Sequence, residues 1–96
     1  MALKIADDLD ATGSTDPLVI KSGFVSVQGT WTGTIEVEVD PVGDGSWSPL
    51  SDSDGADLSY TANFNLAIDN GVPVKTRVTF TRSSGTAEVV LVGDTA

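Results

Sequence analysis

The acidic segment 52–57, with the sequence DSDGAD, is the part of the chain that most resembles a metal-binding loop. Alternating carboxylates before a glycine can supply the roughly six to eight oxygen ligands that Ca²⁺ takes, and Asp40 and Asp44 could lie near this turn. The spacing lacks the complete EF-hand pattern with its bidentate glutamate, and Asp and Gly are typical of any exposed loop. We therefore favour a solvated loop, predict no metal and no cofactor, and keep calcium binding as the alternative.

Catalytic groups are scarce because the chain contains no His and no Cys. This excludes disulfides, zinc fingers, thiol nucleophiles and bases built on imidazole. A serine or threonine nucleophile would need a lysine or a terminal amine to activate it. Lys4, Lys21 and Lys75 do not lie in a Ser-x-x-Lys arrangement. A domain of this size also leaves little room for a substrate cleft. We predict that the protein is not an enzyme and has no catalytic residues.

The charge balance limits the partners. Five basic and fourteen acidic residues give a net charge of −9, which disfavours nucleic acid and anionic membranes. Asp7, Asp8 and Asp10 interrupt any signal-peptide pattern, and the longest apolar run, Val89–Val92, is far too short to span a membrane. We expect synthesis in a cytoplasm, with no nucleic-acid and no membrane partner.

Alternation of apolar and polar residues dominates the chain. In the segment 33–40, Ile35, Val37 and Val39 point one way and the intervening polar residues point the other. The same period predicts further strands over 18–21, 23–28, 46–50, 58–69, 74–82 and 86–92.

The turns and the N-terminal segment complete the expected fold. The sequences DNG at 69–71 and SSG at 83–85 predict hairpins. The fold class is therefore all-β: a single antiparallel β-sandwich of about seven short strands over residues 18–96, preceded by an extended N-terminal arm over residues 1–17. Trp31 and Trp47 are expected to close the two ends of the core, with a partner for each indole N–H.

Two patterns suggest an interface with another protein. Val90 and Val92 point away from the core face of the last strand, and Phe24 points away from the core face of its own strand. Such a face is either covered by the same chain or in contact with a partner.

Charged rows form the second pattern. Lys75 and Arg77 lie on one strand, and Glu36 and Glu38 lie on another. They pair either across adjacent strands or between subunits, where they would set the register. With the apolar residues of the arm added, the candidate interface is Leu3, Ile5, Leu9, Phe24, Val90, Val92, Glu36, Glu38, Lys75 and Arg77.

Three segments carry a family resemblance: GTWTGT at 29–34, GDGSWSPL at 43–50 and VTFTRSSGTA at 78–87. In this order, the chain resembles small β-sandwich structural proteins from the virions of tailed bacteriophages, some of which are capsid decoration (cement) proteins. The resemblance covers roughly residues 22–92, and its motifs are mostly turn and core residues.

The resemblance implies a decoration protein on the capsid surface of the virion, made in the host cytoplasm. It would bind the outer surface of the assembled shell and stabilise contacts between subunits of the major capsid protein. It would be homo-oligomeric, with a trimer favoured, and its arm would reach neighbouring subunits. One alternative is a neck, tail or head-fibre component of the virion. Another is a calcium- or carbohydrate-binding surface module, although Trp31, Trp47 and Tyr60 do not share one face of one strand.

Overall fold

The structure is a computed structural model that describes residues 2–50 and 59–95. Every regular element in it is a strand, and all pairings are antiparallel, which confirms the all-β prediction. No helix that could cross a membrane occurs in these two ranges. The strands are β1 (Ala2–Leu9), β2 (Gly13–Ser14), β3 (Leu18–Asp40), β4 (Ser48–Pro49), β5 (Ser59–Tyr60) and β6 (Phe64–Asp94).

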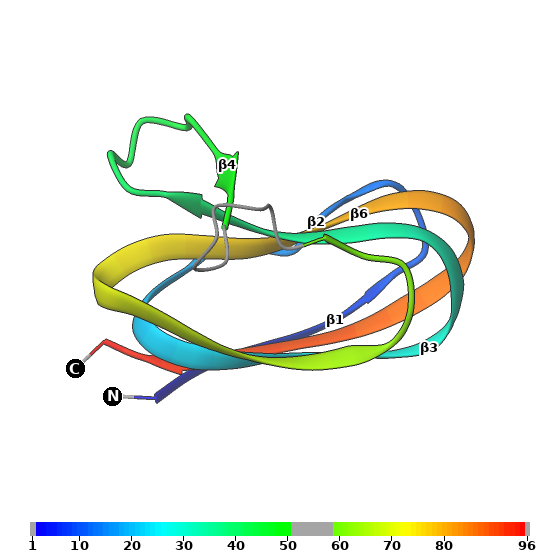
Figure 1. Ribbon diagram of the computed structural model, residues 1–96, viewed down its shortest axis with the longest axis horizontal. Coiled ribbons are helices and arrows are strands. Elements are labelled where there is room, and N and C mark those ends of the chain that lie inside the picture. The colour runs from blue at the N-terminus through cyan, green and yellow to red at the C-terminus, as the bar shows by residue number, and fades with distance from the viewer. Residues whose placement is uncertain (1, 51–58, 96) are drawn as a thin grey trace.

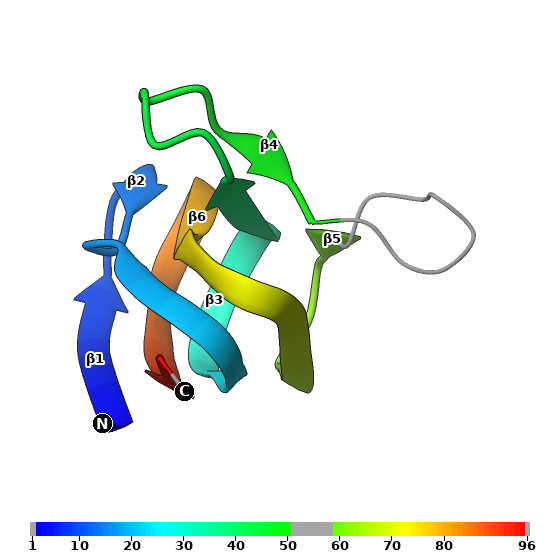
Figure 2. The ribbon, with the colours of Figure 1, turned by 90° about the vertical axis from the view of Figure 1, so that its left-hand side faces the viewer.

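Two long strands, β3 and β6, replace most of the short strands expected from the sequence. They form one antiparallel ribbon that bends, so a single hydrogen-bonded sheet in the order β1-β6-β3-β4 folds over on itself. Figures 1 and 2 show the resulting two layers, with both chain ends at the same end of the molecule. This folding gives the sandwich-like arrangement that the alternation predicts.

The first layer contains β1, residues 87–94 of β6, residues 22–27 of β3 and residues 64–69 of β6, in that order. The second layer contains β2, then residues 75–82 of β6 and residues 33–40 of β3, with β4 and β5 beside β3. Each long strand therefore contributes to both layers.

The bend at 83–85 is a corner in the ribbon, so the hairpin predicted there is wrong. Both sides of this segment pair with β3, since Ser84 lies opposite Thr32 and Arg82 lies opposite Gly33. Gly85 has φ of 80°, and a Cβ there would lie 2.2 Å from the carbonyl oxygen of Thr30. Only glycine allows this close approach of the two strands in a left-handed conformation.

The predicted hairpin at 69–71 is also wrong, for a similar reason. Asp69 lies opposite Ser22 and Val74 lies opposite Ile20, so residues 70–73 bulge out of a ladder that continues on both sides. The Asn70 side-chain amide donates to the Ile20 carbonyl oxygen at 3.0 Å and to Thr76 Oγ1 at 3.2 Å. Turn residues therefore mark both bends correctly, but they do not say which strands pair.

The core lies between the two layers and draws on both halves of β3 and β6. The predicted inward face of 86–92 is confirmed by complete or nearly complete burial. In the segment 33–40, Ile35 and Val37 are fully buried as predicted, whereas Val39 is only half-buried. The buried apolar residues are Leu9, Ile20, Val25, Val27, Ile35, Val37, Ile68, Val78, Phe80, Ala87, Val89 and Leu91.

The two tryptophans have different roles. Trp31 packs edge-on against Phe80, with ring centroids 5.5 Å apart, and its Nε1 donates to Asn63 Oδ1 at 2.7 Å. It covers the core beside the corner, as predicted. Trp47 does not: its ring lies 4.1 Å from the guanidinium carbon of Arg77, on the outer side of the second layer. The prediction that Trp47 closes the core is wrong.

The N-terminal segment also differs from the expected arm. All of β1 pairs with β6, from Ala2 opposite Asp94 to Leu9 opposite Ala87. The connector is held as well, because the Thr15 amide donates to the Val78 carbonyl at 2.9 Å and the Val78 amide donates to Thr15 Oγ1 at 3.1 Å. Pairing satisfies backbone groups that an extended arm would leave to water, so this segment belongs to the sandwich.

Candidate functional site

The outer face of the first layer carries an apolar centre. Phe24 on β3 lies between two residues of β6, Val92 on one side and Ala67 on the other. In the next cross-strand row, Val90 of β6 lies opposite Ala6 of β1. We call these five residues the apolar face. Phe24 is 42% exposed, and Val90 and Val92 are half-buried. Its neighbours cover more than half of Phe24, and the part of the side chain that stays exposed favours contact with a partner.

Strand alternation explains why these side chains point outward. Val25 and Leu91 are fully buried, so their chain neighbours Phe24, Val90 and Val92 must occupy the opposite face. The apolar outer side is therefore a property of the sequence itself. A one-residue slip in register would exchange the two faces and expose the core.

The ends of this outer face are acidic. One flanking row contains Asp69 and Asp94, and the row at the opposite end contains Asp8 and Glu88. Among the described residues in the four rows of this outer face, Lys4, which lies in the row of Val92, is the one cation. The outer face thus combines an apolar middle with a negative rim.

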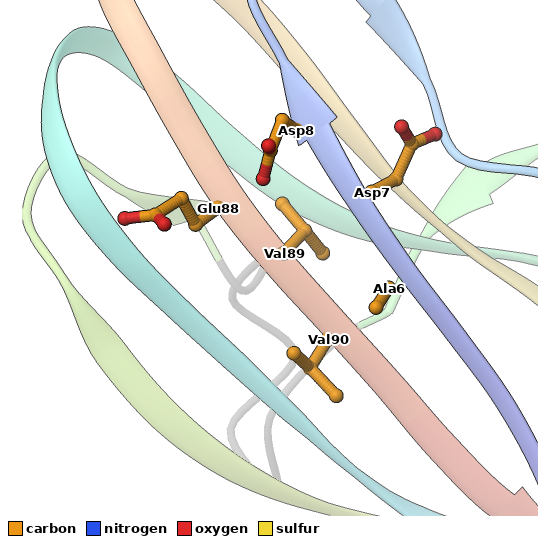
Figure 3. A pocket seen from close by; sticks show the side chains of 6 residues that line it. All are labelled: Ala6, Asp7, Asp8, Glu88, Val89 and Val90. Atoms are coloured by element: carbon orange, nitrogen blue, oxygen red, sulfur yellow. The ribbon is translucent and has the colours of Figure 1, made fainter.

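A shallow hollow lies between β1 and β6 next to the apolar face (Figure 3). Ala6 and Val90 contribute to its apolar part, and Asp8 and Glu88 lie opposite each other across the two strands. Like charges in directly opposed positions destabilise a sheet by a few tenths of a kcal/mol or more. The Asp7 carboxylate points away from the other two carboxylates (Figure 3). Within the described ranges, no three acidic groups are arranged to hold a metal ion.

The residues predicted from the arm lie elsewhere. Leu9 is 8% exposed and belongs to the core, so it is not accessible to a partner in this fold. Leu3 packs against the core, and Ile5 lies opposite the buried Leu91 and is half-buried. These side chains face inward because β1 pairs with β6 in the register that covers the core.

The four predicted charged residues lie on the second layer. Arg77 Nε donates to Glu38 Oε1 at 2.9 Å, and the Thr79 hydroxyl donates to the same carboxylate oxygen. For this pair the geometry supports the intramolecular alternative. Glu36 lies opposite Thr79, and Lys75 lies opposite Asp40. Their role between subunits stays a prediction.

The candidate calcium loop, 52–57, lies outside the described residues. Asp40, which could have helped it, is 2% exposed and accepts hydrogen bonds from the amides of Gly43 at 2.9 Å and Gly45 at 2.8 Å. Burial raises the pKa of Asp40, but these amides, a third from Asp44 and the charge of Lys75 outweigh burial and hold the pKa below its ordinary value. Asp44 accepts from the Ser46 amide at 3.0 Å. Both carboxylates therefore shape the 41–46 loop.

Four further residues on the outer face of the first layer were not predicted. Ala6, Ala67, Asp8 and Glu88 join Phe24, Val90 and Val92 only through cross-strand register, which no local pattern encodes. No family model matches the chain, and neither the curated proteins nor the solved structures contain a match to it.

Proposed function

We propose that this protein is a structural component of a bacteriophage virion: a decoration protein that binds the outer surface of the assembled shell. The observation that carries the proposal is the apolar face, which is centred on the partly exposed ring of Phe24 in a protein of net charge −9. An apolar patch at the centre of a polar rim is typical of protein–protein contact surfaces. The family resemblance supplies the virion as the setting.

The physical logic is linkage. A net charge of −9 keeps free copies apart and soluble at high concentration. A protein that binds only the mature shell stabilises that state by mass action, and the stabilisation grows with the logarithm of its free concentration above the Kd. A rigid sandwich suits this task because little conformational entropy is lost on docking. The major capsid protein is the proposed partner.

Binding to shells tests the proposal. Purified protein is added to expanded capsids that lack decoration, and bound protein is measured together with the melting temperature of the shell. We expect saturable binding and a higher shell melting temperature. Absence of both would refute the proposed function. Hundreds of bound copies per particle indicate a shell protein, whereas about a dozen indicate a neck or tail component.

The proposal includes a homo-oligomer, with a trimer favoured. Glu36 and Lys75 on the second layer remain the predicted contacts between copies, since the pair formed by Glu38 and Arg77 is satisfied within one chain. Sedimentation equilibrium of the free protein at several concentrations measures the oligomeric state. A single species with the mass of one chain at all concentrations would contradict this part.

A further inference from the structure

We propose that the docking partner is a basic protein surface that covers Phe24 with an apolar group and inserts one Lys or Arg side chain into the hollow between β1 and β6. This inference rests on the proposed function, because it names the chemistry of the partner at the same face. The partner is a different protein and not a second copy of this chain.

The hollow can accommodate both the methylene stem and the charged end of a Lys or Arg side chain. Ala6 and Val90 lie side by side in one cross-strand row and provide apolar surface for a methylene stem. The next row places Asp8 opposite Glu88, and both residues line the hollow. The Glu88 carboxylate extends away from Asp8 (Figure 3), toward β3, where its Oε2 would lie 3.1 Å from a Cβ at Gly29. A cationic group in the hollow would be attracted by both negative charges without having to bridge them. Long basic side chains commonly bury their stems on apolar surface while the charged end stays with polar groups.

The two carboxylates favour a cation from outside the chain. In the described ranges, neither Asp8 nor Glu88 has an ion-pair or hydrogen-bond partner. The single nearby lysine of this face, Lys4, lies in the row of Val92, two rows away from the Asp8 row. Within the described chain, no cation therefore offsets these two negative charges, and a bound cation would do so.

Charge also decides against a second copy. Two molecules brought together through this face would oppose Asp8, Glu88 and Asp69 of each, with Lys4 as the described compensating cation on the face. Opposed like charges at an interface cost affinity and suppress association. A partner with a basic rim would be attracted to this acidic rim, whereas a second copy of the chain would be repelled by it.

Two pairs of matched variants test the inference on expanded shells. Asp8→Asn removes one carboxylate of the hollow, and Asp16→Asn makes the same change at an exposed position of the connector. Phe24→Ala removes the apolar anchor, and Val42→Ala truncates a side chain that is 79% exposed in the 41–46 loop.

We expect Asp8→Asn to weaken binding about tenfold and Phe24→Ala by more than tenfold, as for a charge pair and an aromatic anchor at a contact centre. Both controls should stay within about twofold of the wild type. The melting temperature of free Asp8→Asn should be equal to or higher than that of the wild type, because a repulsion is removed. A loss of binding without a loss of stability separates docking from folding.

Equal binding by each variant and its control would overturn the inference while leaving the proposed function standing. A self-associated wild type that dissociates on Phe24→Ala would also overturn it, because a second copy would then occupy the face. If the wild type does not bind shells, the proposed function fails, and an immobilised peptide of alternating leucine and lysine decides the inference separately. Weaker capture of Asp8→Asn and Phe24→Ala than of their controls supports it, and equal capture overturns it.

Discussion

Gly93 shows how one missing side chain determines the packing of the core. A Cβ at this position would lie 2.6 Å from Cγ2, 2.8 Å from Cδ1 and 2.9 Å from Cβ of Ile20, which is fully buried. A β-branched side chain in a filled core has little freedom to move aside. We expect Gly93→Ala to lower the free energy of unfolding by roughly 1–3 kcal/mol, measured by urea denaturation.

Gly13→Ala is the matched control for this prediction. A Cβ at Gly13 would meet no atom within 4 Å, so the same substitution should change stability by less than about 0.5 kcal/mol. Equal effects of the two substitutions would show that Ile20 does not fill the space above Gly93.

The ionisation of Asp40 predicts how the stability of the fold depends on pH. Its pKa is held below the ordinary value, so the ionised form is favoured in the folded state. The stability that this provides is present above the unfolded pKa of about 3.9 and is lost as pH falls through the lower, folded pKa. We expect Asp40→Asn to lower the melting temperature at pH 7, and the difference from the wild type to shrink as the pH falls below the ordinary Asp range.

Thermal unfolding of both proteins across this pH range is the measurement. Asp44→Asn is a useful control, because Asp44 accepts one amide hydrogen bond in an exposed position whereas Asp40 is buried. A melting-temperature difference for Asp40→Asn that stays constant down to strongly acidic pH would contradict the proposed role of the carboxylate charge.

Alternation predicts individual residues well wherever burial alone decides their orientation. Val89 and Leu91 are buried as expected, and Phe24 points away from the core as expected. The location of Trp47 is predicted wrongly, because a large apolar side chain does not reveal that Arg77, from a distant part of the chain, will stack on its ring.

At the scale of elements, β1 is the main departure from the expected fold. Residues 1–16 carry four Asp, a composition that predicts a segment unable to fold alone. The open edge of β6 nevertheless gives β1 a strand with which to pair. Eight successive register pairs join β1 to residues 87–94. The bends at 70–73 and 83–85 show the same limit: glycine and asparagine mark a change of direction, but the partner strand is decided by contacts distant in sequence.

Removal of β1 tests its structural role. Deletion of residues 1–9 would open the edge of β6 beside Ala87, Val89 and Leu91 and remove the buried Leu9. Exposed strand edges promote aggregation. We expect the truncated protein to lose cooperative thermal unfolding or to aggregate, measured by circular dichroism and light scattering.

Lys4→Ala provides the control, because it removes an exposed side chain of β1 and leaves the backbone ladder intact. It should change stability by less than about 0.5 kcal/mol. A truncated protein with the melting temperature of the full chain would show that residues 1–9 are an independent arm, as the sequence alone suggests.

At the scale of the whole molecule, the outer faces of the two layers differ in how far their side chains are paired within the chain. On the second layer, Glu38, Arg77 and Thr79 satisfy one another, and Ser14 Oγ lies 2.9 Å from Thr79 Oγ1. On the first layer, Phe24 and the carboxylates of the hollow have no such partners within the described chain. A polar network that is already satisfied gains little from docking, so the asymmetry directs a partner to the first layer.

Salt should therefore act in opposite directions on folding and on docking. The molecule measures 35 × 29 × 24 Å, and the screening length falls from about 30 Å at 0.01 M salt to about 8 Å at 0.15 M. Self-repulsion among charges that sum to −9 is thus felt across the whole molecule at low salt and is largely removed at the higher concentration. We expect added NaCl over this range to raise the melting temperature of the free protein and to weaken its binding to shells. Sucrose at equal osmolarity controls for solvent effects that do not depend on charge. A melting temperature that falls with salt, or binding that strengthens with it, would contradict an acidic sandwich that recognises a basic partner.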